Sequence, residues 1–363
     1  MQYDWYNTQI KQRLRELKSL RDIDDSKEIR IAISACEAQL GYRKPHSKKE
    51  PSARDLYLSE YLEFKKYNMI WPDLKKFASL GSKGITFDVE KSKIALEPSQ
   101  MFEMTHDFFR DATPQKTFED FLHFYKNRRK DVHFITNSPE SLYAESFYLP
   151  YYREHFIQMI PRNEFGDLST LSHEYGHGIQ FLNNYCQKWF SRNSLFIEII
   201  STFYEFLTLI HYSHNGEYQE AATMALLDNW EEMKYAAGNI NTFLTYTDLM
   251  GLNECANKYE LVKEIDSFIK EFGPTNIAEI SKEDGLISDN IIYVFAASIV
   301  CQLLNIYYED PDKAFYYANK LMMIRPTLSP EEFYEEILNV GIFPNDGFIQ
   351  FEEHMKRELT RFS

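Results

Sequence analysis

The chain has 363 residues, enough for two domains or for one large domain with an attached lobe. Its composition is 44% hydrophobic and 16% aromatic, which is globular, and its 13 Gly and 13 Pro favour long helices over short strands. The net charge of −15 argues against a nucleic-acid partner, because phosphate backbones are bound by clustered Lys and Arg, and it favours cationic substrates. The one compact basic run, Arg128–Lys130, is interpreted as a solvated face.

Cysteine usage and the N-terminus predict a cytoplasmic protein with no membrane partner. The four cysteines are far apart in sequence and form no CxxC pair, which is typical of free thiols in a reducing compartment. The N-terminus carries charges throughout and has no apolar signal segment. The longest uncharged apolar run, near residues 294–304, is too short to span a bilayer.

Helical periodicity dominates the first 130 residues. Apolar residues recur at helical spacing in four regions, at residues 1–40, 55–80, 92–111 and 117–130. Residues 41–53 gather Pro, Ser and Lys, and we expect a loop or linker there.

A small sheet is predicted between residues 131 and 162. Short segments rich in β-branched and aromatic residues, separated by Pro, Asn and Ser, occur at residues 132–136, 146–152 and 155–161. We expect them to pair as an antiparallel sheet. Helices follow at residues 167–184, with Asp167 or Ser169 as cap, and at 194–213. From residue 218 onward the pattern is helical, with breaks at Gly and Pro.

The segment LSHEYGHGIQ, residues 171–180, carries the pattern His-Glu-x-x-His. On a helix, His173 and His177 project from one face one turn apart, so both imidazoles can bind one metal ion. Glu174 lies beside this pair, where it can accept a proton from an attacking water and pass it to a leaving amine. Gly176 leaves room for a second helix or a substrate to approach. The pattern arises by chance in roughly four of a hundred chains of this composition, so the motif alone leaves ordinary core or surface histidines open.

Two glutamates on the next predicted helix complete the candidate site. Glu198 lies inside the apolar run LFIEIISTFYEF, where a carboxylate is costly to bury without a partner such as a metal cation. Glu205 follows two turns later on the same face, where it can accept the free N–H of a ligand histidine and fix its tautomer. The alternative is that both glutamates lie on a solvent-exposed stripe of the helix.

These residues resemble the oligoendopeptidase F and thimet oligopeptidase family of zinc peptidases. GDLSTLSHEYGH is similar to the family's HExGH helix, and Glu198, Ser201 and Glu205 match its Glu-x-x-Ser-x-x-x-Glu helix. The order of Tyr, Asp-Pro, Ser-Pro-Glu and Gly in residues 291–342 is similar to the family's closing helices. The likeness covers approximately residues 95–360.

The resemblance implies a mainly α fold, in which a large helical metallopeptidase domain at residues 95–363 carries a small antiparallel β-sheet beside the active-site channel. A shortened N-terminal helical segment, residues 1–94, would precede it, and so short a lobe predicts a shallow, open channel. A peptide substrate would lie along the exposed edge of the strand at residues 155–161, held by main-chain hydrogen bonds.

The resemblance further implies a zinc-dependent endopeptidase or oligopeptidase. His173, His177 and Glu198 would bind one Zn²⁺, Glu174 would be the general base, and Glu205 would orient a ligand histidine. The ligand types also accept manganese or cobalt.

One departure from the family pattern bears directly on catalysis. The family uses tyrosines of a late helix to stabilise the oxyanion, and our alignment places Phe295, which has no hydrogen-bond donor, where such a tyrosine usually stands. Tyr293, two residues away, is the candidate replacement. Loss of one such donor typically lowers the rate about 100- to 1000-fold. The alternative is therefore a catalytically weakened, zinc-containing peptide-binding or regulatory protein, and a third reading is a helical scaffold without metal.

Overall fold

Helices build most of the protein, as the sequence predicts. The computed structural model describes residues 4–42, 52–83, 94–135, 144–149, 151–184, 197–273, 287–325, 328–342 and 347–360. In the first half of the chain the helices are α1 Asp4–Arg21, α2 Lys27–Tyr42, α3 Ala53–Ile70, α4 Leu74–Lys83, α5 Pro98–Ala112, α6 Gln115–Tyr125, α7 Arg128–Asp131 and α8 Asp167–Asn184. In the second half they are α9 Glu198–His214, α10 Gln219–Leu249, the 3₁₀ turn η3 Leu252–Glu254, α11 Lys258–Phe272, α13 Ile287–Glu309, α14 Pro311–Met322, α15 Pro330–Val340 and α16 Gly347–Thr360.

The small sheet is mixed, which corrects the antiparallel arrangement expected from the sequence. Its strands are β1 Val132–Phe134, β2 Ala144–Leu149 and β3 Glu154–Met159, in the order β1-β3-β2. β2 and β3 form an antiparallel hairpin, whereas β1 pairs with β3 in parallel. Strand direction alternates along the chain, so β1 and β3 point the same way, and their direct pairing is parallel. The periodicity of each strand cannot reveal this choice of neighbour.

The strand order also corrects the predicted substrate edge. The segment 155–161 contains β3, which is paired on both sides and offers no free edge. The edges of the described sheet are β1 and β2.

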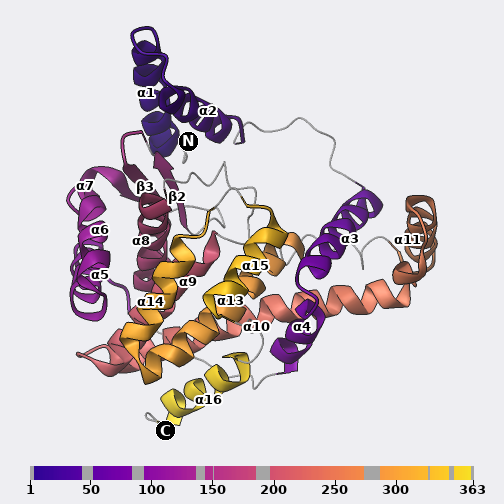
Figure 1. Ribbon diagram of the computed structural model, residues 1–363. Coiled ribbons are helices and arrows are strands. Elements are labelled where there is room, and N and C mark those ends of the chain that lie inside the picture. The colour runs from indigo at the N-terminus through magenta and orange to yellow at the C-terminus, as the bar shows by residue number, and fades with distance from the viewer. Residues whose placement is uncertain are drawn as a thin grey trace.

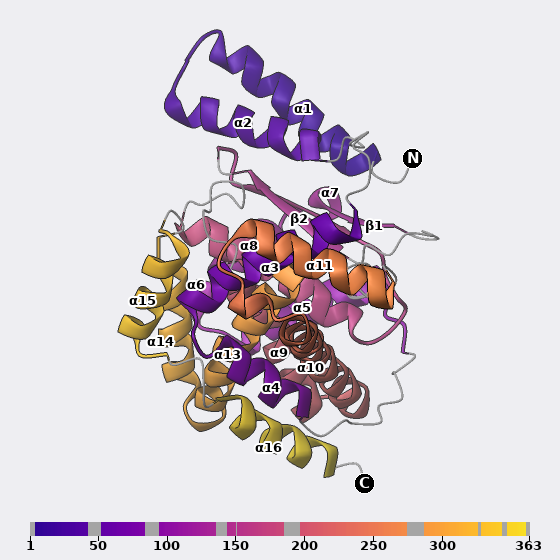
Figure 2. The ribbon, with the colours of Figure 1, turned by 90° about the vertical axis from the view of Figure 1, so that its right-hand side faces the viewer.

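The helical hairpin of α1 and α2 lies over one face of the sheet, at the top of Figures 1 and 2. Ile10 and Leu17 of α1 share a hydrophobic cluster with Phe147 of β2 and Phe156 of β3. The neighbouring strand residues, such as Ile157, point to the other face and join the main core. This alternation follows from the two-residue period of a strand. The sheet is thus covered on both faces.

An ion pair ties the hairpin to the sheet. The Arg13 guanidinium of α1 donates to both carboxylate oxygens of Glu154 in β3, at 2.5 and 2.6 Å. Such paired hydrogen bonds fix the angle between the two groups.

The main core joins α8, α9, α10 and α13 with the helices around them. α3 and α4 belong to the same core, since Trp71 packs edge-to-face against Phe295 of α13 with ring centroids 5.2 Å apart. The described part of the N-terminal 94 residues therefore contacts the rest of the protein through the α1–α2 hairpin on the sheet and through α3–α4 in the core. The division at residue 94 stays a prediction.

Proline and glycine explain two breaks that the periodicity did not show. The predicted helix at 55–80 is interrupted at Trp71, because Pro72 has no N–H and disfavours helical geometry in the residue before it. α10 ends before Gly251, whose φ of +64° is a left-handed conformation that suits glycine. Most of the predicted linker at 41–53 and Cys186 lie outside the described residues; Cys36, Cys255 and Cys301 are free thiols.

One segment of α13 is long and apolar enough to cross a membrane by length and composition, at Asp289–Glu309. Of its most apolar stretch, 67% is buried inside the protein. The segment therefore has the environment of a core helix.

Candidate metal centre and its cavity

The motif helix α8 begins at a tightly bonded turn. The carboxylate of Asp167 accepts hydrogen bonds from the backbone N–H groups of Arg162, Asn163 and Glu164, at 3.0, 2.9 and 3.3 Å. The Ser169 hydroxyl donates to the backbone oxygen of Gly166 at 2.9 Å. These bonds connect the end of the sheet to the first turn of α8, one turn before the two histidines.

Gly176 allows α8 and α9 to approach each other closely. A Cβ atom at this position would lie 2.8 Å from the Cα of Ser201 on α9 and 3.1 Å from the ring of Tyr204. Only glycine fits so near another backbone. Because Ser201 is one turn from Glu198, this close contact brings the carboxylate of α9 to the histidine face of α8.

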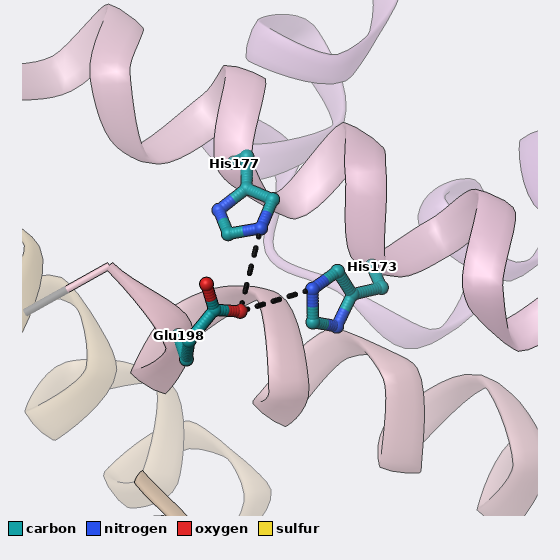
Figure 3. Close-up of side chains that lie close together, drawn as sticks. All are labelled: His173, His177 and Glu198. Carbon is teal, nitrogen blue, oxygen red and sulfur yellow. Dashed lines mark ion pairs between the residues drawn. The ribbon is translucent and has the colours of Figure 1, made fainter. Parts of the chain in front are cut away.

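The structure brings the three predicted ligands together (Figure 3). The Nε2 atoms of His173 and His177 lie 3.3 and 3.5 Å from Oε2 of Glu198. All three donor atoms lie within 4.8 Å of one another, and the side chains are 14%, 7% and 12% exposed.

This donor set fits a catalytic zinc ion. Two imidazoles and one carboxylate are a common ligand set, with an open fourth position. Bonds of about 2 Å in tetrahedral geometry separate neighbouring ligand atoms by about 3.3 Å, close to the two nitrogen-to-oxygen distances observed here. The side chains are therefore placed for a metal with little rearrangement.

A second carboxylate fixes the outer side of His173. The Nδ1 of His173 lies 2.8 Å from Oε2 of Glu205, as predicted from the two-turn spacing on α9. An N–H at Nδ1 donates to this oxygen and leaves the Nε2 lone pair for a metal. Burial by itself would lower the pKa of His173, but Glu205 and Glu198 outweigh it and hold the pKa well above its ordinary value. A site that so favours a proton also attracts a metal cation.

Glu174 and Tyr293 both line the cavity next to this cluster. Glu174 is 6% exposed, and Tyr293 of α13 is 49% exposed because it faces the cavity. The negative charge of Glu198, with further contributions from Glu174 and Glu205, raises the pKa of Tyr293 well above its ordinary value. The Tyr293 hydroxyl therefore stays protonated and can donate a hydrogen bond.

Phe295 lies away from the cavity. It is fully buried against Trp71, on the side of α13 that faces the core. Two residues on a helix are about 200° apart around its axis, so Tyr293 and Phe295 occupy opposite faces. The described wall of the cavity therefore loses no hydrogen-bond donor by having phenylalanine at position 295.

The cavity has a volume of about 430 Å³ and opens between α8, α9, α10 and α13. Its lining includes five carboxylates, which are Glu164, Glu174, Glu205, Asp228 and Glu232. It also includes the Arg162 guanidinium, 3.6 Å from Glu232.

Several residues that line the cavity belong to no sequence motif, so the sequence analysis did not identify them. Asp228, Asn229 and Glu232 come from one face of α10, far from the motif in sequence. The available signal was that these three polar side chains share one face of the helix. It does not indicate which other helix that face meets.

The other histidines that the structure describes do not join the cluster. His214 pairs with Glu358 at 2.9 Å, near the C-terminus of α9, and His155 of β3 is buried beside Phe124. In the basic run, the charged guanidinium of Arg128 lies over the ring of Tyr125, 3.9 Å from its centroid, while Arg129 and Lys130 are exposed.

Solved structures with a similar fold are peptidases. An oligoendopeptidase F from Bacillus anthracis str. Ames superposes with a TM-score of 0.52 at 14% identity, over 95% of this chain and 64% of the other. A second oligoendopeptidase F gives 0.52 at 14% identity, over 94% and 66%. PZ peptidase A with an inhibitor gives 0.52 at 16% identity, over 88% and 60%.

These likenesses confirm the predicted resemblance at the level of the fold. The chain spans slightly less than two-thirds of the length of each of the three structures. No protein-family model and no curated protein matches the sequence.

Proposed function

We propose that this chain, which has the fold of the oligoendopeptidase F type of peptidase, is a zinc-dependent endopeptidase or oligopeptidase. The observation that carries the proposal is the convergence of His173, His177 and Glu198, with Glu174 on the wall of the same cavity. The widely spaced free thiols favour a cytoplasmic location.

Each residue has a distinct task in the proposed reaction. His173, His177 and Glu198 would hold the ion, which when bound polarises a peptide carbonyl and lowers the pKa of water. Glu174 takes the proton of the attacking water and delivers it to the leaving amine. Glu205 keeps His173 in the tautomer that presents Nε2. Tyr293 donates a hydrogen bond to the oxyanion that develops on the carbonyl oxygen.

A peptide is the proposed substrate, and we now place it along β2. Ala144, the first residue of β2, lines the cavity, and β2 is an edge of the described sheet. An extended peptide can add to such an edge through main-chain hydrogen bonds, which make few demands on side chains. This arrangement favours cleavage of many different sequences.

The alternative of a catalytically weakened peptide-binding protein loses its main argument. It rested on Phe295, which lies in the core, while Tyr293 offers a hydroxyl at the cavity.

Metal removal tests the proposal and separates the alternatives. Chelation should abolish peptidase activity on a mixed peptide library, and one equivalent of Zn²⁺ should restore it. One bound zinc without turnover would support the peptide-binding alternative, and no bound metal would support a helical scaffold. Short peptides and folded proteins should be compared in the same assay, because cleavage of short peptides alone would contradict an open channel.

A further inference from the structure

We propose that Asn229 of α10 is a positioning residue for the metal centre, acting through Glu205 on His173. The inference rests on the proposed function, because it assumes that His173 binds a metal. It adds a third helix to a site that the sequence motifs assign to α8 and α9 alone.

The contacts form a chain across three helices. Nδ2 of Asn229 donates to Oε1 of Glu205 at 3.0 Å, and the other oxygen, Oε2, lies 2.8 Å from Nδ1 of His173. Each oxygen of the carboxylate thus has its own donor. His173 in turn presents Nε2 to Glu198 at 3.3 Å.

The second donor matters because a glutamate carboxylate is loosely held by its own chain. Its last torsion has a broad energy profile, so a carboxylate bonded at one oxygen can still turn. Glu205 and Asn229 both line the cavity, where water can compete for these oxygens. A bond at Oε1 from a neighbouring helix fixes the carboxylate plane and keeps Oε2 directed at the histidine.

The chemistry of asparagine suits this position. A carboxylate accepts hydrogen bonds only, so the NH₂ end of the Asn229 amide must face it. The amide is neutral and leaves the full negative charge on Glu205 to raise the basicity of His173. A lysine or arginine in its place would draw that charge away from the histidine.

The contact is directed at the cavity and does not fill the core. Asn229 is half-buried, whereas the next residue, Trp230, is fully buried and packs against Phe348 and Phe351. Loss of the Asn229 amide should therefore disturb the site more than the fold.

Two substitutions and a control test the proposal. Asn229→Ala removes the amide, and Asn229→Asp keeps its size but replaces the donor by an oxygen that cannot donate when ionised. Asn241→Ala, on the same helix, removes an amide that makes no bond to Glu205. Zinc affinity is measured by competition with a chromophoric chelator, and the melting temperature is measured on the metal-free proteins.

We expect zinc affinity to fall about tenfold in Asn229→Ala and at least as much in Asn229→Asp, since partners of ligand histidines are worth 10- to 100-fold. The value for Asn241→Ala should equal that of the wild type. With peptide substrates at saturating zinc, kcat should fall while KM changes little.

Wild-type zinc affinity in both Asn229 variants would overturn the inference, and so would a drop in melting temperature with unchanged affinity. A wild-type protein that binds no zinc would instead refute the proposed function, so the two failures are distinguishable.

Discussion

The substitution Tyr293→Phe isolates the proposed oxyanion donor, because it removes one hydroxyl and keeps the ring. Tyr293 is 49% exposed to the cavity, so the fold should lose little, on the order of 0.5 kcal/mol or less. Loss of one oxyanion donor costs about 100- to 1000-fold in kcat, or about 2.7 to 4 kcal/mol. KM should stay near the wild-type value, because the hydrogen bond strengthens only as charge develops.

The assay is steady-state hydrolysis of an internally quenched peptide at saturating zinc, with zinc content measured in parallel. Phe295→Tyr is the matched control. Phe295 is fully buried against Trp71, so a hydroxyl there lacks solvent and should cost about 1 to 3 kcal/mol of stability without any gain in kcat.

Two results would contradict the role of Tyr293 as the oxyanion donor. The first is an unchanged kcat in Tyr293→Phe. The second is a raised kcat in Phe295→Tyr, which would show that position 295, and not 293, faces the reacting carbonyl.

Three further predictions follow from the packing and the charges. Gly176→Ala places a Cβ 2.8 Å from the Cα of Ser201, so it should lower the free energy of unfolding by about 1 to 3 kcal/mol and weaken zinc binding. The control Gly238→Ala has open space around it and should be neutral or stabilising. Equal melting temperatures of the two variants would contradict this prediction. Burial lowers the pKa of His155 to about 3, so below pH 6.5 the His155 imidazole is protonated in the unfolded chain but stays neutral in the folded protein. Between pH 6.5 and 5 the free energy of unfolding of the metal-free wild type should therefore fall by about 2 kcal/mol more than that of His155→Leu. Denaturant titrations at each pH measure this difference. Parallel pH profiles for the two proteins would contradict the prediction. Peptides with Lys beside the cleaved bond should have kcat/KM about tenfold above matched Glu peptides, less so at high salt, because five carboxylates line the cavity; equal values would argue against it.

Local patterns in the sequence predicted the helices well and singled out three side chains that the structure brings together. The spacing of His173 and His177 fixes their common face on any helix, and the apolar surroundings of Glu198 and Glu205 made a solvent-exposed stripe improbable. Both glutamates indeed lie within reach of the histidines. Gly176 proved to be the point where the two helices cross.

Features that depend on which helices and strands contact one another could not be predicted from the sequence. Period-two patterns identified β1, β2 and β3, but such patterns do not show that β1 pairs with β3, or that it does so in parallel. Asn229 reaches Glu205 only because α10 packs on α9. Whether Tyr293 or Phe295 faces the cavity depends on how α13 is rotated about its axis, and a sequence alignment does not show that rotation.

The substitution Glu174→Gln tests whether Glu174 is the general base of a zinc peptidase. Glutamine has nearly the same shape but cannot take a proton as a base, and Glu174 is not among the three converging donors. The variant should keep one bound zinc and lose about 100- to 10000-fold in kcat. Glu358→Gln, which alters a buried carboxylate paired with His214 outside the cavity, should keep its activity. A Glu174→Gln protein that retains both its zinc and full peptidase activity would contradict the account.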